Sequence, residues 1–278
     1  LAKLGLKQPD VTKLQTGGPD GDLGSNEILI SHDRTTSIVD GSGVIHDPNG
    51  LDRKELTRLA TERVMIEDFD MKALGPDGFR VLVNENDVTL PNGDNVANGA
   101  MFRNNFHTNP LASADLFVPC GGRPESINAN NVDKLFDPET GQCMFKYLIE
   151  GANLFVTADA RATLEDRGVV LFKDASTNKG GVTSSSMEVL AALSLTDDEF
   201  DVNMRVPSNN PEDAPQFYKE YVEEIVEIVK DNAKQEFEVL WKEHEESGIP
   251  RHQLTDILSG RINELNVAVQ SSTLWEDP

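Results

Sequence analysis

The sequence has few cysteines and no long apolar run. It contains two cysteines, Cys120 and Cys143, and no Asn-x-Ser/Thr acceptor site for N-glycosylation. This usage is typical of a reducing, intracellular compartment, either cytoplasmic or mitochondrial. No apolar run approaches the roughly 20 residues that a membrane-spanning helix needs. Residues 1–10 have no signal-peptide pattern. We therefore expect an intracellular globular protein.

Basic residues are also scarce. Lys and Arg number 25 against 48 Asp and Glu, so the formal net charge is −23. A field of this sign repels nucleic acid and anionic membrane surfaces, and we expect neither as a partner. The 278 residues are enough for one large or two smaller domains with a sizeable core.

Short β-rich runs alternate with helix-like stretches over the first two thirds of the chain. Continuous apolar segments such as 116–118 and 169–172 are typical of strands buried on both faces of a parallel sheet. Strands alternating with helices predict an α/β fold with right-handed βαβ units and a mostly parallel sheet. The predicted strands lie within 12–18, 35–41, 114–122, 146–153 and 167–174, and helices are predicted at 25–31 and 49–64.

Two later regions depart from this alternation. Within 65–113, Pro91-Asn92-Gly93 indicates a hairpin, so we expect an inserted β excursion that serves as a lid, an oligomer contact or decoration. Residues 194–217 are polar and contain proline, which predicts a linker or a loop. Apolar residues at helical spacing then recur in acidic sequence, with a face that is either solvated or a recruitment surface. We expect a domain at 1–195 and an acidic helical segment at 196–278.

The stretch TGGPDGDLGSNE (16–27) places Gly18, Gly21 and Gly24 at every third position after a predicted strand. Glycines let the backbone approach a phosphate, and a following helix presents its positive end to an anion. Asp20 also resembles the start of a calcium loop, but the twelfth position would be Ser31 rather than a bidentate glutamate. The spacing alone leaves a phosphate loop and a plain turn both open.

Asp40 ends the second predicted strand, about 20 residues after the glycine turn. In dinucleotide-binding folds an acid at this point accepts hydrogen bonds from the adenosine ribose and repels a 2′-phosphate. The alternative is a turn-capping aspartate in Asp40-Gly41. Agreement with the glycine turn supports the ribose interpretation.

No residue is predicted to be a catalytic nucleophile or a metal ligand. The sequence has no G-x-S-x-G elbow, and the residues from Thr183 to Ser186 open a predicted helix, where one of them would serve as N-cap. Cys120 has no histidine partner in view and is expected to be a small strand-end residue. The five histidines show no metal-ligand spacing.

Longer motifs occur in a fixed order along the chain. They are TGGPDGDLGSNEI (16–28), DGSGVIHDPNGLD (40–52), FRNNFH (102–107), VPCGGRPESINANN (118–131), LIEGAN (148–153) and NKGGVTSSSMEV (178–189). Together they resemble segments of the large NAD-specific glutamate dehydrogenases of fungi. The resemblance runs from about residue 10 to the end of the chain and is sharpest over 10–195.

The resemblance implies a Rossmann-like domain that binds NAD, and it assigns residues by position. Gly18, Gly21 and Gly24 match the turn that approaches the pyrophosphate, and Asp40 matches the region that meets the adenosine ribose. The remaining implied cofactor residues are Asp22, Leu23 and Ser25 through their backbone N–H groups, Pro119 and Cys120 after the third strand, and Asn153 and Asn178 at the nicotinamide.

The resemblance also implies an activity, with Ser185 touching the substrate carboxylate. The reaction is the oxidative deamination of L-glutamate to 2-oxoglutarate and ammonia, with hydride transfer to NAD, in a homo-oligomer, a tetramer. The family uses a catalytic lysine from a preceding substrate domain, and no Gly-Gly-Gly-Lys-Gly-Gly-like stretch occurs here.

We therefore expect a cofactor-domain fragment that is inactive alone and carries no catalytic residue of its own. Lys179 stands where many relatives have alanine. Two alternatives stay open: a dehydrogenase of another amino acid, and a non-catalytic nucleotide-binding or interaction module.

Overall fold

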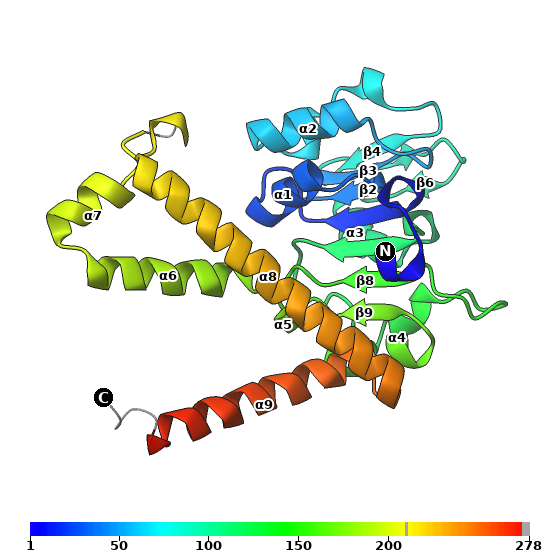
Figure 1. Cartoon of the computed structure of the whole chain (residues 1–278). Coiled ribbons are helices and arrows are strands. Elements are labelled where there is room, and N and C mark those ends of the chain that lie inside the picture. Colours follow the sequence, from blue (N-terminus) through cyan, green and yellow to red (C-terminus); the bar gives the residue numbers. More distant parts are fainter. Residues whose placement is uncertain (209–210, 274–278) are drawn as a thin grey trace. The chain divides into compact units, whose positions relative to one another are not determined.

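The structure, a computed structural model, describes residues 1–208 and 211–273 (Figure 1). It divides into two compact units, Leu1–Asp174 and Ala175–Pro278, and each is described by itself. The domain boundary expected between residues 195 and 196 falls inside the second unit. Within the described ranges no helix is both long and apolar enough to cross a membrane.

The first unit is built on a seven-stranded sheet with the order β4-β3-β2-β1-β7-β8-β9. The five strands β2-β1-β7-β8-β9 run parallel to one another, which confirms the predicted α/β fold with a mostly parallel sheet. They match the five predicted strands: β1 Thr12–Thr16, β2 Arg34–Val39, β7 Leu116–Pro119, β8 Tyr147–Ile149 and β9 Val170–Phe172.

The sequence did not predict the two antiparallel strands that extend the sheet beyond β2. β3 (Gly43–His46) pairs with β2, and β4 (Phe79–Leu82) pairs with β3. Because β4 comes from residues 65–113, that segment is only partly an excursion. Its predicted hairpin is present as a separate two-stranded sheet of β5 (Val88–Thr89) and β6 (Asn95–Val96).

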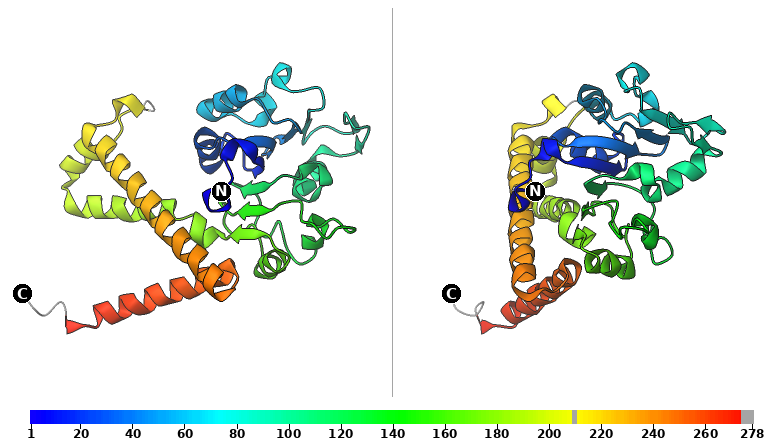
Figure 2. Two further views of the ribbon diagram at one scale, coloured as in Figure 1. Left: turned by 45° about the vertical axis from the view of Figure 1, so that its right-hand side comes forward. Right: turned by 90° about the vertical axis from the view of Figure 1, so that its right-hand side faces the viewer.

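Alternating side chains of the sheet face two hydrophobic clusters. Ile38 and Ile45 point into the cluster beneath α1 (Asp22–Ile30) and α2 (Arg53–Glu62). Their neighbours Val39 and Val44 point into the opposite cluster, as the two-residue period of a strand requires. That second cluster is covered by α3 (Gly99–Asn105) and α4 (Ala158–Asp166) together with short 3-10 turns (Figure 2).

β1 also carries a buried charge, which joins three neighbouring elements. Lys13 has no exposed side-chain area, and its Nζ lies 2.9 Å from Glu27 Oε1 on α1 and 2.9 Å from Asp33 Oδ2 before β2. Nζ also donates to Ser31 Oγ at 3.0 Å. Such a buried cation is tolerated because both carboxylates and the hydroxyl satisfy it.

The second unit is helical. After the short α5 (Asp174–Thr177), the chain forms four helices: α6 (Gly180–Ser194), α7 (Asp197–Met204), α8 (Gln216–Ser247) and α9 (Arg251–Gln270). α8 packs against α6, α7 and α9. The predicted helical character of the C-terminal segment is confirmed.

Two local predictions in this unit were wrong. The expected linker or loop, of which residues 209–210 lie outside the described residues, contains α7, because Thr196 and Glu199 form a capping box that starts a helix. The run from Thr183 to Ser186 does not cap α6, which already begins at Gly180. The Thr183 hydroxyl instead donates to the Lys179 carbonyl inside the helix.

Candidate functional site

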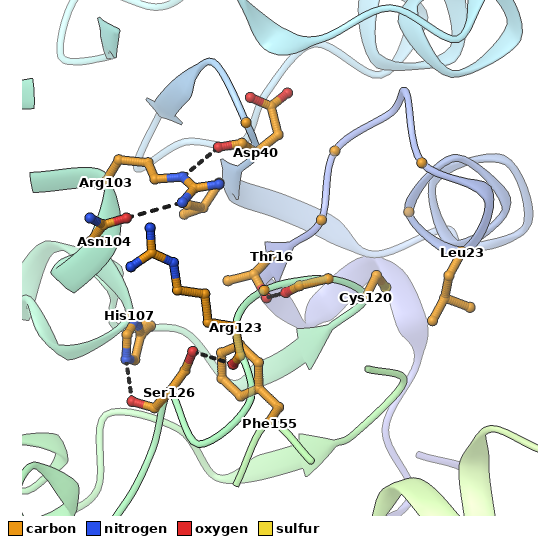
Figure 3. A pocket seen from close by; sticks show the side chains of 18 of the residues that line it. Thr16, Leu23, Asp40, Arg103, Asn104, His107, Cys120, Arg123, Ser126 and Phe155 are labelled. Atoms are coloured by element: carbon orange, nitrogen blue, oxygen red, sulfur yellow. Dashed lines mark hydrogen bonds between the residues drawn. The ribbon is translucent and has the colours of Figure 1, made fainter. Parts of the chain in front are cut away.

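A cleft of about 460 Å³ lies at the carboxyl ends of β1, β2 and β7 (Figure 3). β1 pairs with β2 on one side and with β7 on the other, so the chain reverses its direction of progress across the sheet here. Ligands of open α/β sheets bind at such a switch point. The lining comes from the glycine turn after β1, the end of β2, α3 and the loop that leaves β7.

The glycine turn is packed against backbone on several sides. Gly17 has φ +87°, and a Cβ on it would lie 2.5 Å from the Gly121 nitrogen. A Cβ on Gly24 would overlap the Gly18 carbonyl oxygen, whereas one on Gly21 would lie 3.6 Å from that atom. Close approach therefore requires glycine at Gly17 and Gly24 more strictly than at Gly21. The predicted set of every third glycine omitted Gly17.

The first turn of α1 supplies hydrogen-bond donors to the cleft. α1 begins at Asp22, and the N–H groups of a first helical turn have no carbonyl partner within the helix. Asp22, Leu23 and Gly24 all line the cleft. Ser25 does not line it, because its side chain is buried and its N–H donates to the Gly21 carbonyl at 2.9 Å. The donors available to an anion thus come from the three residues before Ser25.

The Asp40 side chain caps the turn between β2 and β3. Oδ1 accepts from the Ser42 N–H at 2.8 Å and the Ser42 hydroxyl at 2.7 Å, and also from the Gly43 N–H. Oδ2 accepts from the Ile66 N–H at 2.8 Å. Burial raises the pKa of this carboxyl, and these donors act against that shift. The geometry matches the turn-capping alternative, so a ribose contact would have only the remaining lone pair of Oδ2.

Pro119 and Cys120 lie where β7 ends. The Cys120 N–H donates to the Thr16 carbonyl at 2.6 Å, and the residue lines the cleft. Burial, with a contribution from Glu27, raises the pKa of the Cys120 thiol. The thiol is therefore not activated as a nucleophile. Pro119 is buried, and its carbonyl accepts the Ala152 N–H at 2.6 Å.

The loop after β8 carries Asn153, which is exposed and is not among the residues that line the cleft. A Cβ on Gly151 would lie 2.7 Å from Leu23 Cδ2, so this loop packs against the first turn of α1. The loop is held by Glu150, which is fully buried and bonds Arg161 through both carboxylate oxygens, at 2.7 and 2.8 Å. The structure thus brings the loop that carries Asn153 against the first turn of α1.

The remaining predicted residues belong to the second unit. Asn178 precedes α6, and Ser185 is exposed on α6. The Lys179 ammonium forms an ion pair with Glu236 of α8. The roles predicted for Asn178 and Ser185 stay predictions.

Several residues of the cleft were not predicted from the sequence. Arg103 of α3 donates from Nε to the Asp40 carbonyl at 2.7 Å. His107 Nε2 lies 3.0 Å from the Ser126 carbonyl, and burial lowers the pKa of this histidine. Arg123 and Phe155 complete the wall. The signal was present in FRNNFH and VPCGGRPESINANN, which carry three of these four residues.

A mostly parallel sheet with a glycine turn and a helix start at its switch point defines a Rossmann-like α/β domain. The sequence pattern described as Glutamate/Leucine/Phenylalanine/Valine dehydrogenase matches residues 1–248. The chain belongs to this family.

Named relatives are similar over the whole chain. The chain is 57% identical over 277 residues to "Glutamate dehydrogenase 2" of Dictyostelium discoideum and 52% identical over 275 residues to the "NAD-specific glutamate dehydrogenase" of Neurospora crassa. These alignments cover 100% and 99% of this chain but 26% of each relative. The chain thus spans about a quarter of the length of these relatives.

Solved structures share the fold at low sequence identity. Glutamate dehydrogenase from Peptoniphilus asaccharolyticus has a TM-score of 0.54 at 15% identity, covering 97% of this chain and 49% of that chain. The hetero-hexameric glutamate dehydrogenase from Thermus thermophilus has a TM-score of 0.53 at 16% identity, covering 91% and 46%. At these identities the similarity supports the fold.

Proposed function

We propose that the cleft binds NAD and that the chain is the cofactor-binding part of a glutamate dehydrogenase. One structural observation carries the proposal: a glycine turn whose close approaches exclude side chains joins β1 to the start of α1 at the switch point of the sheet. The names of the relatives support the choice of cofactor and of substrate, because Neurospora crassa and Saccharomyces cerevisiae relatives are called NAD-specific glutamate dehydrogenases.

The residues of the cleft fit a dinucleotide. A pyrophosphate needs backbone donors, a positive helix end and close approach of the main chain, and the turn offers the first turn of α1 together with the glycines Gly17, Gly18, Gly21 and Gly24. When bound, NAD would supply the hydride acceptor. In this role Asp22, Leu23 and Gly24 would donate to the phosphates through their N–H groups, and Asp40 would meet the ribose through Oδ2.

Orientation and positioning are the contributions of this chain to the reaction. The loop after β8 is fixed by Glu150 and Arg161, so Asn153 stands on a rigid support where its amide can both donate to and accept from a carboxamide. We place Asn178 with it at the nicotinamide and Ser185 at the substrate carboxylate. The whole protein would convert L-glutamate to 2-oxoglutarate and ammonia, in the cytoplasm or mitochondrion, as a tetramer whose mass light scattering would measure.

Calorimetry of the purified chain with NAD tests this function. We expect saturable NAD binding and a thermal shift, and no glutamate-dependent NADH formation by the chain alone. Absence of binding would favour a non-catalytic module. Glutamate-dependent NADH formation by the isolated chain would contradict the expectation that it is inactive alone.

The family description also names leucine, phenylalanine and valine, which keeps a dehydrogenase of another amino acid as a second candidate. Both candidates share the same cofactor cleft. Turnover of the longer protein with each amino acid in turn would separate them.

A further inference from the structure

Two arginines from outside the glycine turn line the same cleft. Among the cleft-lining residues that the structure describes, Arg103 and Arg123 are the only lysine or arginine side chains, and burial lowers the pKa of the third basic residue, His107. Arg103 comes from α3, within the inserted segment 65–113, and Arg123 comes from the loop after β7. Figure 3 shows the two guanidinium groups between α3 and that loop.

Arg103 stands on a firmly packed helix. A Cβ on Gly99 at the start of α3 would overlap the Leu82 carbonyl oxygen, so α3 presses directly on β4. Phe102 packs against Phe79 of β4 and against Phe106, with ring centroids 6.0 and 5.3 Å apart. The strand and helix of the inserted segment therefore hold Arg103 at the end of β2.

The Arg103 guanidinium is only partly engaged. Nε donates to the Asp40 carbonyl at 2.7 Å, and Nη1 donates to Asn104 Oδ1 at 3.0 Å. Because guanidinium has five N–H groups, the bonds of Nε and Nη1 orient the fork and leave further donors for a ligand. Arg103 and the residues of the glycine turn line the same cleft.

Arg123 has a fixed backbone and an unengaged side chain. The Arg123 carbonyl accepts a hydrogen bond from the Ser126 hydroxyl at 2.6 Å. In the same loop, the Glu125 N–H donates to the Leu154 carbonyl at 2.7 Å. In residues 1–208 and 211–273 the guanidinium has no hydrogen bond or ion pair. Two residues earlier, Gly121 contacts Gly17 of the turn.

Four acids line the cleft, namely Asp20, Asp22, Asp40 and Glu125, and in the described part of the chain none of their carboxylates pairs with either arginine side chain. Asp22 pairs with Arg63 at 2.8 Å. The Asp40 carboxylate is bonded to the β2–β3 turn, and Figure 3 shows it turned away from the Arg103 guanidinium. Acids outnumber arginines in the cleft, but the two guanidinium groups have no carboxylate partner, so they are the positive charges that an anion entering the cleft can meet.

We propose that Arg103 and Arg123 bind the pyrophosphate of the dinucleotide from the side opposite the first turn of α1. The proposal rests on the proposed NAD function of the cleft and deepens it. Arginine forms forked, charge-assisted hydrogen bonds with phosphate oxygens, which the neutral N–H groups of the turn cannot replace. The inserted segment thereby has a role: it delivers Arg103 to the cofactor.

Affinity measurements on Arg123→Gln test the proposal first, because this side chain makes no hydrogen bond or ion pair within the described residues, so its replacement should not affect folding. We expect the variant to bind NAD and ADP roughly 10- to 100-fold more weakly, while adenosine, which has no phosphate, binds as it does to the original chain. Arg103→Lys keeps the charge but loses the fork, and we expect a smaller loss of the same kind. Arg58→Gln, on α2 and outside the cleft, is the matched control and should leave all three affinities unchanged.

The outcomes separate the proposal from the function it rests on. If the original chain binds NAD and both arginine variants bind it equally well, the phosphate role is wrong and the NAD function stands. An equal loss for adenosine and ADP would overturn it in favour of adenine contacts. A loss confined to NADP would assign the arginines to a 2′-phosphate instead. If the original chain binds no NAD, the proposed function itself fails. Support would include an NAD affinity that falls less steeply with salt in Arg123→Gln than in the original chain.

Discussion

Gly18 lies directly against the side chain of Asp40. A Cβ on Gly18 would be 2.5 Å from the Asp40 Cβ and 2.6 Å from its Oδ2, although 22 positions separate the two residues in the sequence. The glycine turn and the β2–β3 turn therefore pack directly against each other, so a substitution in one of them changes the packing of the other.

The three glycines at every third position should differ in their tolerance of alanine. Gly24→Ala overlaps a backbone carbonyl, and Gly18→Ala meets Asp40, so we expect each to destabilise the fold by about 1–3 kcal/mol and to abolish measurable NAD binding. Gly21→Ala makes only an ordinary 3.6 Å contact and serves as the control. Urea unfolding of the three variants measures the free energy of unfolding that each one loses. Equal losses for all three variants would contradict the close approaches described here.

Asp40→Asn should act mainly on stability. The amide nitrogen would face the Ile66 N–H or the Ser42 donors with a donor of its own, which leaves buried groups unsatisfied and costs about 1–3 kcal/mol. Calorimetry of the folded variant then measures its affinities for NAD and NADP, which tests whether the Asp40 carboxylate contacts the adenosine ribose. A changed ratio of the two affinities would support a ribose contact through Oδ2, and an unchanged ratio would assign Asp40 to capping alone.

Two buried histidines should make stability depend on pH near neutrality. Burial lowers the pKa values of His46 and His107 below the ordinary 6.5. The unfolded chain therefore binds protons at a higher pH than the folded chain. Stability is complete above pH 6.5 and is lost as the pH falls from there toward the folded pKa values.

Denaturant unfolding of His46→Gln and His107→Gln between about pH 5 and 8 measures this loss. We expect each variant to show a shallower decline than the original chain. Parallel profiles would show that the histidines are not the groups that titrate, because the acidic side chains remain common to all three proteins.

Lys13→Met should be among the most destabilising substitutions of a charged residue. It removes the cation between Glu27 and Asp33 and leaves Asp33, with 4% of its side chain exposed, without its partner. Breaking a buried pair in this way costs about 3–5 kcal/mol. Adding Asp33→Asn to Lys13→Met should restore part of the loss. Lys146→Met, which breaks a pair whose lysine is 69% exposed, should cost no more than about 1 kcal/mol.

The sequence predicted the parallel part of the sheet because its strands are continuous apolar runs, as at Leu116–Pro119. β3 was missed because glycine begins it and Asp47-Pro48 follows it, which indicates a turn rather than a strand. The glycine turn was predictable because its residues are contiguous. Arg103 was not, since its bond to Asp40 spans 63 positions and α3 has only seven residues. Local patterns do not report such distant contacts.

The meeting of Gly17 with Gly121 has a consequence for how this cleft can diversify. Two main chains touch there, at the ends of β1 and β7, and neither position has room for a side chain. Mutation can therefore rarely reshape the floor of the cleft. Variation in ligand preference among proteins built this way must come from the rim, where α3 and the loop around Arg123 present side chains. Exchanging those two segments between relatives is the direct route to altered cofactor choice.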